Sequence, residues 1–149
     1  MLIHELNSAQ CREVLARSEL GRLACSRLDQ PYVVPIHFAF DEARNCIYAF
    51  STIGQKVQWM RENPKVCLEI EEIEDKHAWT TVVVFGRYEE IHQRPEEVEA
   101  RRRAEPLFAA RGEWWLPAVA RLPGREPHEV VVYRIQIDRL TGRRAGGGG

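Results

Sequence analysis

Strict alternation over residues 32–40, YVVPIHFAF, is the feature that most restricts how this chain can fold. Successive side chains of a β-strand point to opposite faces, so this run forms two different surfaces. One face is large and apolar, as a barrel interior requires, and consists of Tyr32, Val34, Ile36, Phe38 and Phe40. The other mixes small, polar and imidazole groups, as a cleft or an interface does, and consists of Val33, Pro35, His37 and Ala39.

The rest of the chain divides into runs typical of strands and of helices. Strands are predicted at 20–28, 32–40, 46–51, 65–72, 78–91 and 128–140, and helices at 7–18, 54–63 and 95–111. Loops of hairpin length join most successive strands, which predicts a mainly β, antiparallel fold with peripheral helices. Six strands with one apolar face favour closure into a barrel, because closure removes exposed edges. Since proline cannot donate a backbone hydrogen bond, Pro35 predicts an edge, a bulge or a non-strand neighbour.

The chain is long enough to build one hydrophobic core. It has 149 residues, of which 44% are hydrophobic and 29% are charged, a composition typical of a soluble globular domain. We expect a single domain over residues 1–141. The glycine-rich end, residues 142–149, is predicted to be a disordered tail.

Charge and cysteine content argue against several classes of function. The formal net charge is -1, so no global positive field would attract nucleic acid or an anionic membrane. The N-terminus lacks a secretory signal pattern, and no apolar stretch reaches the roughly 20 residues of a transmembrane helix. We therefore expect a cytoplasmic protein. The four cysteines are far apart and form no C-x-x-C pair, which predicts reduced core thiols and no metal site.

Residues 49–63, AFSTIGQKVQWMREN, carry the most informative pattern. A strand is predicted to end at Ser51, and after a short loop a helix begins with Lys56 in its first turn. Free N–H groups and the positive end of the helix dipole make such a helix start an anion site. The hydroxyls of Ser51 and Thr52 and the ammonium of Lys56 would together suit a phosphate monoester.

The same residues have a purely structural interpretation. Thr52-Ile53-Gly54-Gln55 matches a capping box, in which Thr52 and Gln55 would only close the start of the helix. Lys56 would then be an ordinary solvated lysine. Spacing alone favours this second interpretation, because capping boxes far outnumber phosphate sites.

Four segments of the chain match one known superfamily in order and spacing. They are GRLACSRLDQPYVVPIHFAFD, YAFSTIGQKVQWMRENPKVCLEIEE, WTTVVVFGRYEEI and VYRIQIDRLTGRR, within residues 12–144. Together they resemble the pyridoxamine 5′-phosphate oxidase-related, FMN-binding split-barrel superfamily, and within it the flavin-nucleotide-binding proteins related to nitroimidazole-resistance proteins. The resemblance implies a six-stranded antiparallel split β-barrel with FMN as cofactor. It also implies a homodimer that holds the flavin between its two protomers.

Matched position by position, the resemblance implies a set of cofactor contacts. The ribityl chain and phosphate would be held at the predicted strand–helix corner by Ser51, Thr52, Gln55 and Lys56. The isoalloxazine would lie along the backbone and side chains of Pro35, Ile36, His37 and Phe38. Thr80 and Thr81 fall where relatives place polar groups near the cofactor.

Phe50 departs from the superfamily pattern. Many related proteins have a histidine at this position, and in some of them it lies beside the flavin and is linked to nitro-group reduction. Its replacement by Phe50 argues against a nitroreductase. His37, on the neighbouring strand, is the candidate catalytic residue, although a lone strand histidine is more often structural.

The resemblance leaves three functions open. The first is an FMN-dependent oxidoreductase that acts on a small-molecule substrate and meets any nicotinamide electron donor transiently, because the chain has no G-x-G-x-x-G fingerprint. The second is a flavin carrier or sensor without turnover. The third is a haem-binding split barrel with His37 as axial ligand. Because related proteins have similar segments, GEWWLP at 112–117 is expected at the mouth of the pocket.

Overall fold

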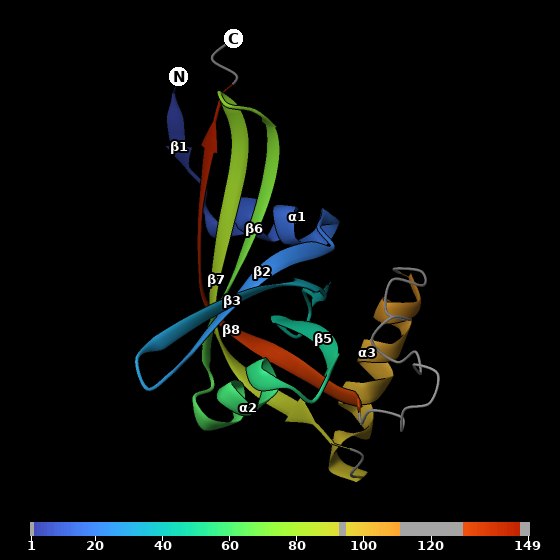
Figure 1. The fold of residues 1–149 in the computed structure, drawn as a ribbon. Helices are drawn as coiled ribbons and strands as arrows, with labels where there is room; N and C mark the ends of the chain where they lie inside the picture. The colour runs from blue at the N-terminus through green and yellow to red at the C-terminus, as the bar shows by residue number, and fades with distance from the viewer. Residues whose placement is uncertain (1, 93–94, 111–129, 147–149) are drawn as a thin grey trace, which may run out of the picture.

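The protein is built on one curled antiparallel sheet flanked by helices (Figure 1). The structure, a computed structural model, describes residues 2–92, 95–110 and 130–146. The strands are β1 (Ile3–Glu5), β2 (Leu20–Arg27), β3 (Gln30–His37), β4 (Ala39–Asp41), β5 (Cys46–Thr52), β6 (Lys65–Asp75), β7 (Ala78–Ile91) and β8 (Val130–Ala145). The helices are α1 (Ser8–Arg17), α2 (Gln55–Glu62) and α3 (Val98–Ala110), which follows the 3-10 turn η1 (Pro95–Glu97). None of the helices in the described ranges is long and apolar enough to cross a membrane.

The sheet remains split between β3 and β4. Its strand order is β3-β2-β6-β7-β8-β5-β4, and β1 pairs with β8 beside this path. The predicted strand 32–40 therefore divides at Phe38, whose N–H donates to the carbonyl of Glu19 at 2.9 Å instead of joining a ladder. The mainly β, antiparallel split-barrel fold is confirmed. The described part contains eight strands rather than six, because β1 was not predicted and one predicted strand is two.

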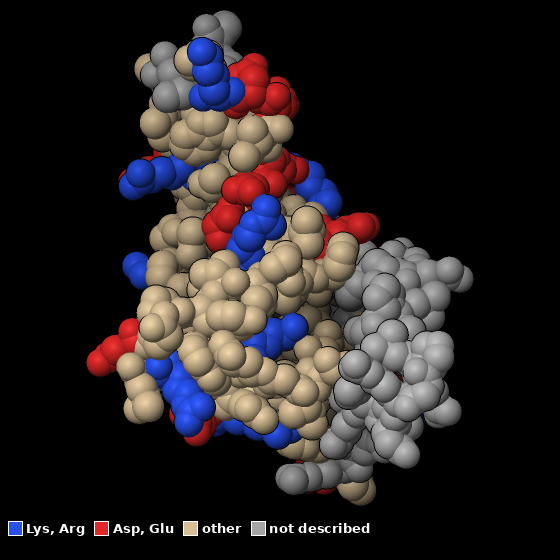
Figure 2. Space-filling model, viewed as in Figure 1, with Lys and Arg blue, Asp and Glu red and all other residues tan. Residues whose placement is uncertain are grey.

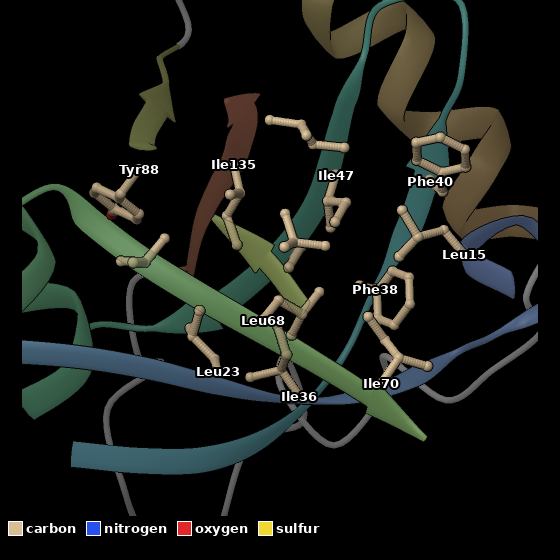
Figure 3. Packing of buried hydrophobic residues seen from close by; sticks show 14 of the residues in the cluster. Leu15, Leu23, Ile36, Phe38, Phe40, Ile47, Leu68, Ile70, Tyr88 and Ile135 are labelled. Carbon is tan, nitrogen blue, oxygen red and sulfur yellow. The ribbon is translucent and has the colours of Figure 1, made fainter. Parts of the chain in front are cut away.

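The alternation of residues 32–40 determines which of their side chains point into the hydrophobic core (Figure 3). Ile36, Phe38 and Phe40 turn into the barrel interior, where they pack with apolar side chains from α1, β2, β5, β6 and β8. Pro35 lies on β3, an end strand of the sheet, which is one of the positions expected for a strand proline. Ala39 differs from the expectation. It is fully buried in a second cluster with Tyr48, because α3 covers that side of β4 and β5.

A blade, formed by β1, the β6–β7 hairpin and the end of β8, extends above the barrel (Figure 1). Here β8 continues to Ala145, so the predicted disordered tail at 142–149 is wrong for residues 142–145, and the boundary at 141 lies too early. Arg143 is paired with Glu5 of β1 and with Thr81 of β7. Backbone hydrogen bonds to a strand on each side hold this polar segment in the β conformation. Residues 147–149 lie outside the described part.

Candidate functional site

The junction of β5 and α2 has the geometry of an anion site. β5 ends at Thr52, and the N-cap of α2 is Gly54, which makes no side-chain capping hydrogen bond. The capping-box interpretation, with Thr52 as cap, is therefore wrong. Beyond its chain neighbours, no atom lies within 4 Å of the position that a Cβ of Gly54 would take, and no side chain caps the first N–H groups of α2. Those groups and the helix dipole favour a bound anion.

The two predicted hydroxyls of this corner do not act alike. Ser51 is buried, and its hydroxyl donates to the carbonyl oxygen of Thr52 at 2.8 Å. Thr52 follows it on the strand and so points to the opposite face, where it is half-buried. Its hydroxyl makes no hydrogen bond within the described residues. Thr52 is thus the hydroxyl left for a ligand, while Ser51 stabilises the turn.

Lys56 provides a positive charge that no carboxylate of the described residues neutralises. Its side chain is half-buried, and this burial lowers the pKa of the ammonium from its ordinary value of 10.5. Across the described ranges, no carboxylate forms an ion pair with it. Within the described part of the chain, the ionisable group that influences it is the thiol of Cys25, whose own pKa is raised by burial, so this thiol stays neutral. A desolvated cation of this kind is stabilised by binding an anion.

Cys25 was not among the predicted site residues. It was interpreted only as one of four core thiols, and it is indeed buried, as are Cys11 and Cys46. Its alternation with Leu23 in the predicted strand 20–28 indicated an inward side chain. No local pattern indicates that α2 would bring Lys56 close to it, because that proximity depends on how the helix packs on β2.

The predicted isoalloxazine contacts on β3 divide between two faces. Ile36 and Phe38 belong to the core, so only their backbone is left for a ligand on the outer face. Pro35 and His37 are exposed on that outer face, at the free edge of the sheet. Phe50, at the position where many relatives have histidine, is half-buried and packs against the cluster beneath α3.

Thr80 and Thr81 lie on the blade, apart from this corner. Thr52 pairs with Val130 at the start of β8, whereas Thr80 pairs with Arg144 near its end. Thr80 is buried, and its hydroxyl accepts a hydrogen bond from Nε of Arg144 at 3.2 Å. A single chain therefore does not bring the two threonines to Lys56.

Two further features bear on the choice of ligand. No group of metal-ligating side chains occurs within the described residues. Basic and acidic side chains are interspersed on the face shown in Figure 2, without a large area of one sign. Local charge at the corner, rather than a general positive field, therefore selects for an anion. The segment 112–117, expected at the pocket mouth, lies outside the described residues.

Comparisons with known proteins cover almost the whole chain. A protein of Rhizobium meliloti is 37% identical over an alignment 150 residues long, which covers 97% of each chain. The crystal structure of a FAD-binding protein from Mesorhizobium loti is 35% identical, with a TM-score of 0.80 and 99% of both chains covered. A candidate 5-nitroimidazole antibiotic resistance protein from Bacteroides thetaiotaomicron is 16% identical, with a TM-score of 0.66 over 99% of this chain and 93% of that one. At this identity the last comparison supports the fold alone.

The sequence profile of one family matches the chain from just before α1 to the end of β8. Its matched range, residues 7–144, includes the β5–α2 corner, the outward residues of β3 and both threonines of the blade. The four segments that carried the resemblance all lie within it. With this match, and with the split barrel now observed, the chain belongs to the pyridoxamine 5′-phosphate oxidase family.

Proposed function

We propose that this protein binds a flavin nucleotide, with the phosphate at the junction of β5 and α2. The observation that carries the proposal is the half-buried ammonium of Lys56, which has no carboxylate partner in the described residues and lies in the first turn of a helix without a side-chain cap. Both features favour a bound anion. The name of the 35% identical Mesorhizobium loti structure, a FAD-binding protein, supports a flavin nucleotide as that anion.

FMN is the first candidate among flavin nucleotides. Its phosphate monoester is a dianion, and it would place two negative charges beside Lys56 and the free N–H groups of α2. FAD is the second candidate, and the name of the Mesorhizobium loti structure favours it. Acid release of the nucleotide from the purified protein, followed by chromatography against both standards, distinguishes them.

A bound flavin would supply two-electron redox chemistry, and the chain would bind and orient it. We therefore propose an oxidoreductase that acts on a small molecule. His37 is exposed on the outer face of β3, next to the proposed path of the ring system, and remains the candidate for proton transfer. Phe50 offers no proton, which supports a reaction other than nitro-group reduction.

We also propose that the site is completed by a second copy of the chain. Thr80 and Thr81 lie at the opposite end of β8 from the corner, so in one chain they cannot reach a ligand held by Lys56. In a two-fold dimer, the blade of one protomer would lie close to the corner of its partner. A monomer that binds FMN with full affinity would contradict this part of the proposal.

The test replaces Lys56 by glutamine and compares FMN with riboflavin, which has the same ring system and no phosphate. Loss of a charge-assisted contact should weaken FMN binding by roughly 10- to 100-fold and leave riboflavin affinity unchanged. Lys65→Gln is the matched control, because Lys65 is exposed and lies outside the corner. If Lys56→Gln binds FMN like the wild type, or loses FMN and riboflavin affinity equally, the phosphate is not at this corner.

The pH dependence of binding gives a second readout. Burial lowers the pKa of Lys56, so its positive charge is lost at a lower pH than that of an ordinary lysine. FMN affinity of the wild type should therefore fall as the pH rises through this range, and Lys56→Gln should not show the fall. Titrations by flavin fluorescence measure both.

A further inference from the structure

Two glutamates share the outer face of β6, the face turned away from the barrel core. Residues on this face alternate with the buried Leu68 and Ile70, and they include Glu69 and Glu71. Arg22 of β2 lies directly opposite Glu69 in the ladder. Its guanidinium, however, contacts Oε1 of Glu71 at 3.3 Å. The nearest cation is thus committed to Glu71 rather than to its direct neighbour.

Glu69 is left without full compensation. Its Oε1 atom is buried and has no hydrogen-bond partner within the described residues. Burial raises the pKa of Glu69 above its ordinary 4.5, and the charge of Glu71 and a hydrogen bond between the two side chains raise it further. Arg22 acts in the opposite direction but is the weaker influence. Two adjacent carboxyl groups of this kind hold one proton between them more easily than either would alone.

The other strands packed against the pair place uncharged residues beside it and charged residues one strand further away. β7 places Thr81 and Val83 opposite Glu71 and Glu69. β8 follows with Arg143 and Thr141, which pair with these two β7 residues. Among the described residues, Arg22 of β2 lies on one side of the pair. On the other side, one strand further away, β8 carries Arg139 and Arg143, and Glu5 of β1 pairs with Arg143.

The same face is open in one chain and suits a second copy. A hollow of about 530 Å³ is partly lined by Thr81 and Val83, the β7 neighbours of Glu71 and Glu69. Thr141 and Arg143 of β8 and Glu5 of β1 also line it. Apolar and charged groups occur together on this face. Phe85 lies under the guanidinium of Arg139, with 4.1 Å between the ring centre and the guanidinium carbon, and the negative charge comes from the glutamates of β6. A surface that carries both signs and apolar area can complement itself across a two-fold axis.

We propose that a second copy of the chain docks on this outer face of β2, β6, β7 and β8, and that the Glu69–Glu71 pair takes up one proton from the buffer when it does. Self-association is then stronger at mildly acidic pH. This inference rests on the dimer of the proposed function and adds a regulation of it. It differs from a fixed interface, whose strength would not follow the proton concentration.

The direction follows from desolvation. Docking removes water from Glu69, whose Oε1 is already buried, and so disfavours its charged form further. Protonation removes that charge and lets the carboxyl group donate a hydrogen bond to Glu71. A dimer takes up two protons, one per protomer, so its association constant can rise by at most about 100-fold for each unit by which the pH falls. We expect a rise of about tenfold or more from pH 8 to pH 5.5.

Sedimentation at nanomolar to micromolar concentrations of the purified protein, from pH 5.5 to pH 8, tests the inference. The wild-type dimer should dissociate at lower concentration at pH 5.5 than at pH 8. Glu69→Gln imitates the protonated form, so its dimer at pH 8 should be as tight as the wild-type dimer at pH 5.5, without further pH dependence. Glu74→Gln is the matched control, because Glu74 is exposed near the end of the same strand, and it should keep the wild-type profile.

Three outcomes would overturn the inference. The first is wild-type association that does not vary with pH, and the second is a Glu69→Gln variant with an unchanged pH profile. The third is weaker association on acidification, which would mean that an arginine of the second copy pairs with ionised Glu69. The wild-type profile decides the matter even if the variant fails to fold. FMN titrations on the same samples separate the two proposals: a pH-insensitive dimer that binds FMN leaves the proposed function standing.

Discussion

Replacing Tyr133 by phenylalanine should stabilise the protein, although the ring lies at the centre of the core. Tyr133 is on β8, opposite Ala49 of β5, and its side chain has 0% exposure. Its hydroxyl makes no hydrogen bond in the part of the chain that the structure describes. Burial raises the pKa of this hydroxyl, so it is neutral at any ordinary pH. The molecule thus buries a polar group without compensation.

The size of the effect follows from what the substitution removes. A buried hydroxyl without a partner costs about 1–3 kcal/mol relative to its hydrated state. Removing one oxygen leaves a void of roughly 10 Å³, which costs about 0.2 kcal/mol at about 24 cal/mol per Å³. The variant should therefore be more stable by about 1–2 kcal/mol, which for a chain of this length raises the Tm by about 2–8 °C.

Tyr88 provides a matched control with the opposite sign. Its ring lies 5.1 Å from that of Tyr133, centre to centre, in the same core. Its hydroxyl, however, donates to Oε1 of Glu90 at 2.8 Å. Tyr88→Phe removes a hydrogen bond to a charged group and should destabilise the protein by about 1.5–3 kcal/mol. Both substitutions keep the ring, so the difference between them reports on the hydroxyls alone.

Urea unfolding of flavin-free protein measures both variants, since a bound ligand would add its own free energy to the stability. An unchanged slope with urea would show that the unfolded state is unaffected. If Tyr133→Phe is less stable than the wild type, the Tyr133 hydroxyl has a partner in solution and the reasoning is refuted. The same conclusion follows if both variants shift in the same direction by similar amounts.

Two further substitutions test other parts of the fold. Asp41→Asn should lower stability at neutral pH, because the carboxylate of Asp41 accepts two hydrogen bonds from Arg103 at 2.8 Å and attaches α3 to the barrel. Arg103 lowers the pKa of Asp41 below its ordinary 3.8, so the stabilisation by this ion pair is present above about pH 4 and is lost as the pH falls further. The urea midpoint of the wild type should therefore decline below about pH 4 through loss of this pair, and that of the variant should lack this decline. Leu28→Asn should raise the free energy of unfolding by about 1 kcal/mol. Leu28 is 90% exposed in a two-residue turn and has a φ of 49°, a conformation that asparagine tolerates better than leucine. A lower Tm for this variant would contradict that argument.

Much of the sheet could be predicted from the sequence because alternation reports directly on which face is buried. Ile36, Phe38 and Phe40 were assigned correctly to the interior on that basis. The capping box that begins α1, formed by Asn7 and Gln10, was also predictable, since both partners lie within one turn. These features depend on residues close together in the chain.

The errors concern contacts between distant residues. Ala39 was assigned to the face of a cleft or an interface, and it is buried in the chain's own second core cluster because α3, which begins almost sixty residues later, covers it. Arg143 and Arg144 were assigned to a disordered tail, and they form strand because β1 and β7 supply a partner on each side. Composition gave no indication of either pairing, since arginines before a run of glycines are typical of a solvated chain end.

The corner at α2 shows where local pattern and local geometry diverge. Thr52 and Gln55 have the right spacing for a capping box, and a threonine cap would have occupied the first N–H groups of the helix. β5 instead continues through Thr52, and the cap falls on Gly54, which has no side chain to offer. The difference of two residues decides whether the helix start is satisfied internally or available to a ligand.

The ammonium of Lys56, the Oε1 atom of Glu69 and the hydroxyl of Tyr133 all lack a partner among the described residues, but only the first two can acquire one. Tyr133 is sealed in the core, where no ligand can reach it, so its hydroxyl only lowers stability. Lys56 and Glu69 are half-buried, so each can be approached by another molecule. Their charges differ, and so do the partners that would compensate them: an anion for the ammonium of Lys56, and a proton for the carboxylate of Glu69. Lys56 and Glu69 are therefore assigned a binding role because each has an uncompensated charged group that another molecule can reach. Tyr133 is assigned none, because its unpaired hydroxyl lies in a closed core.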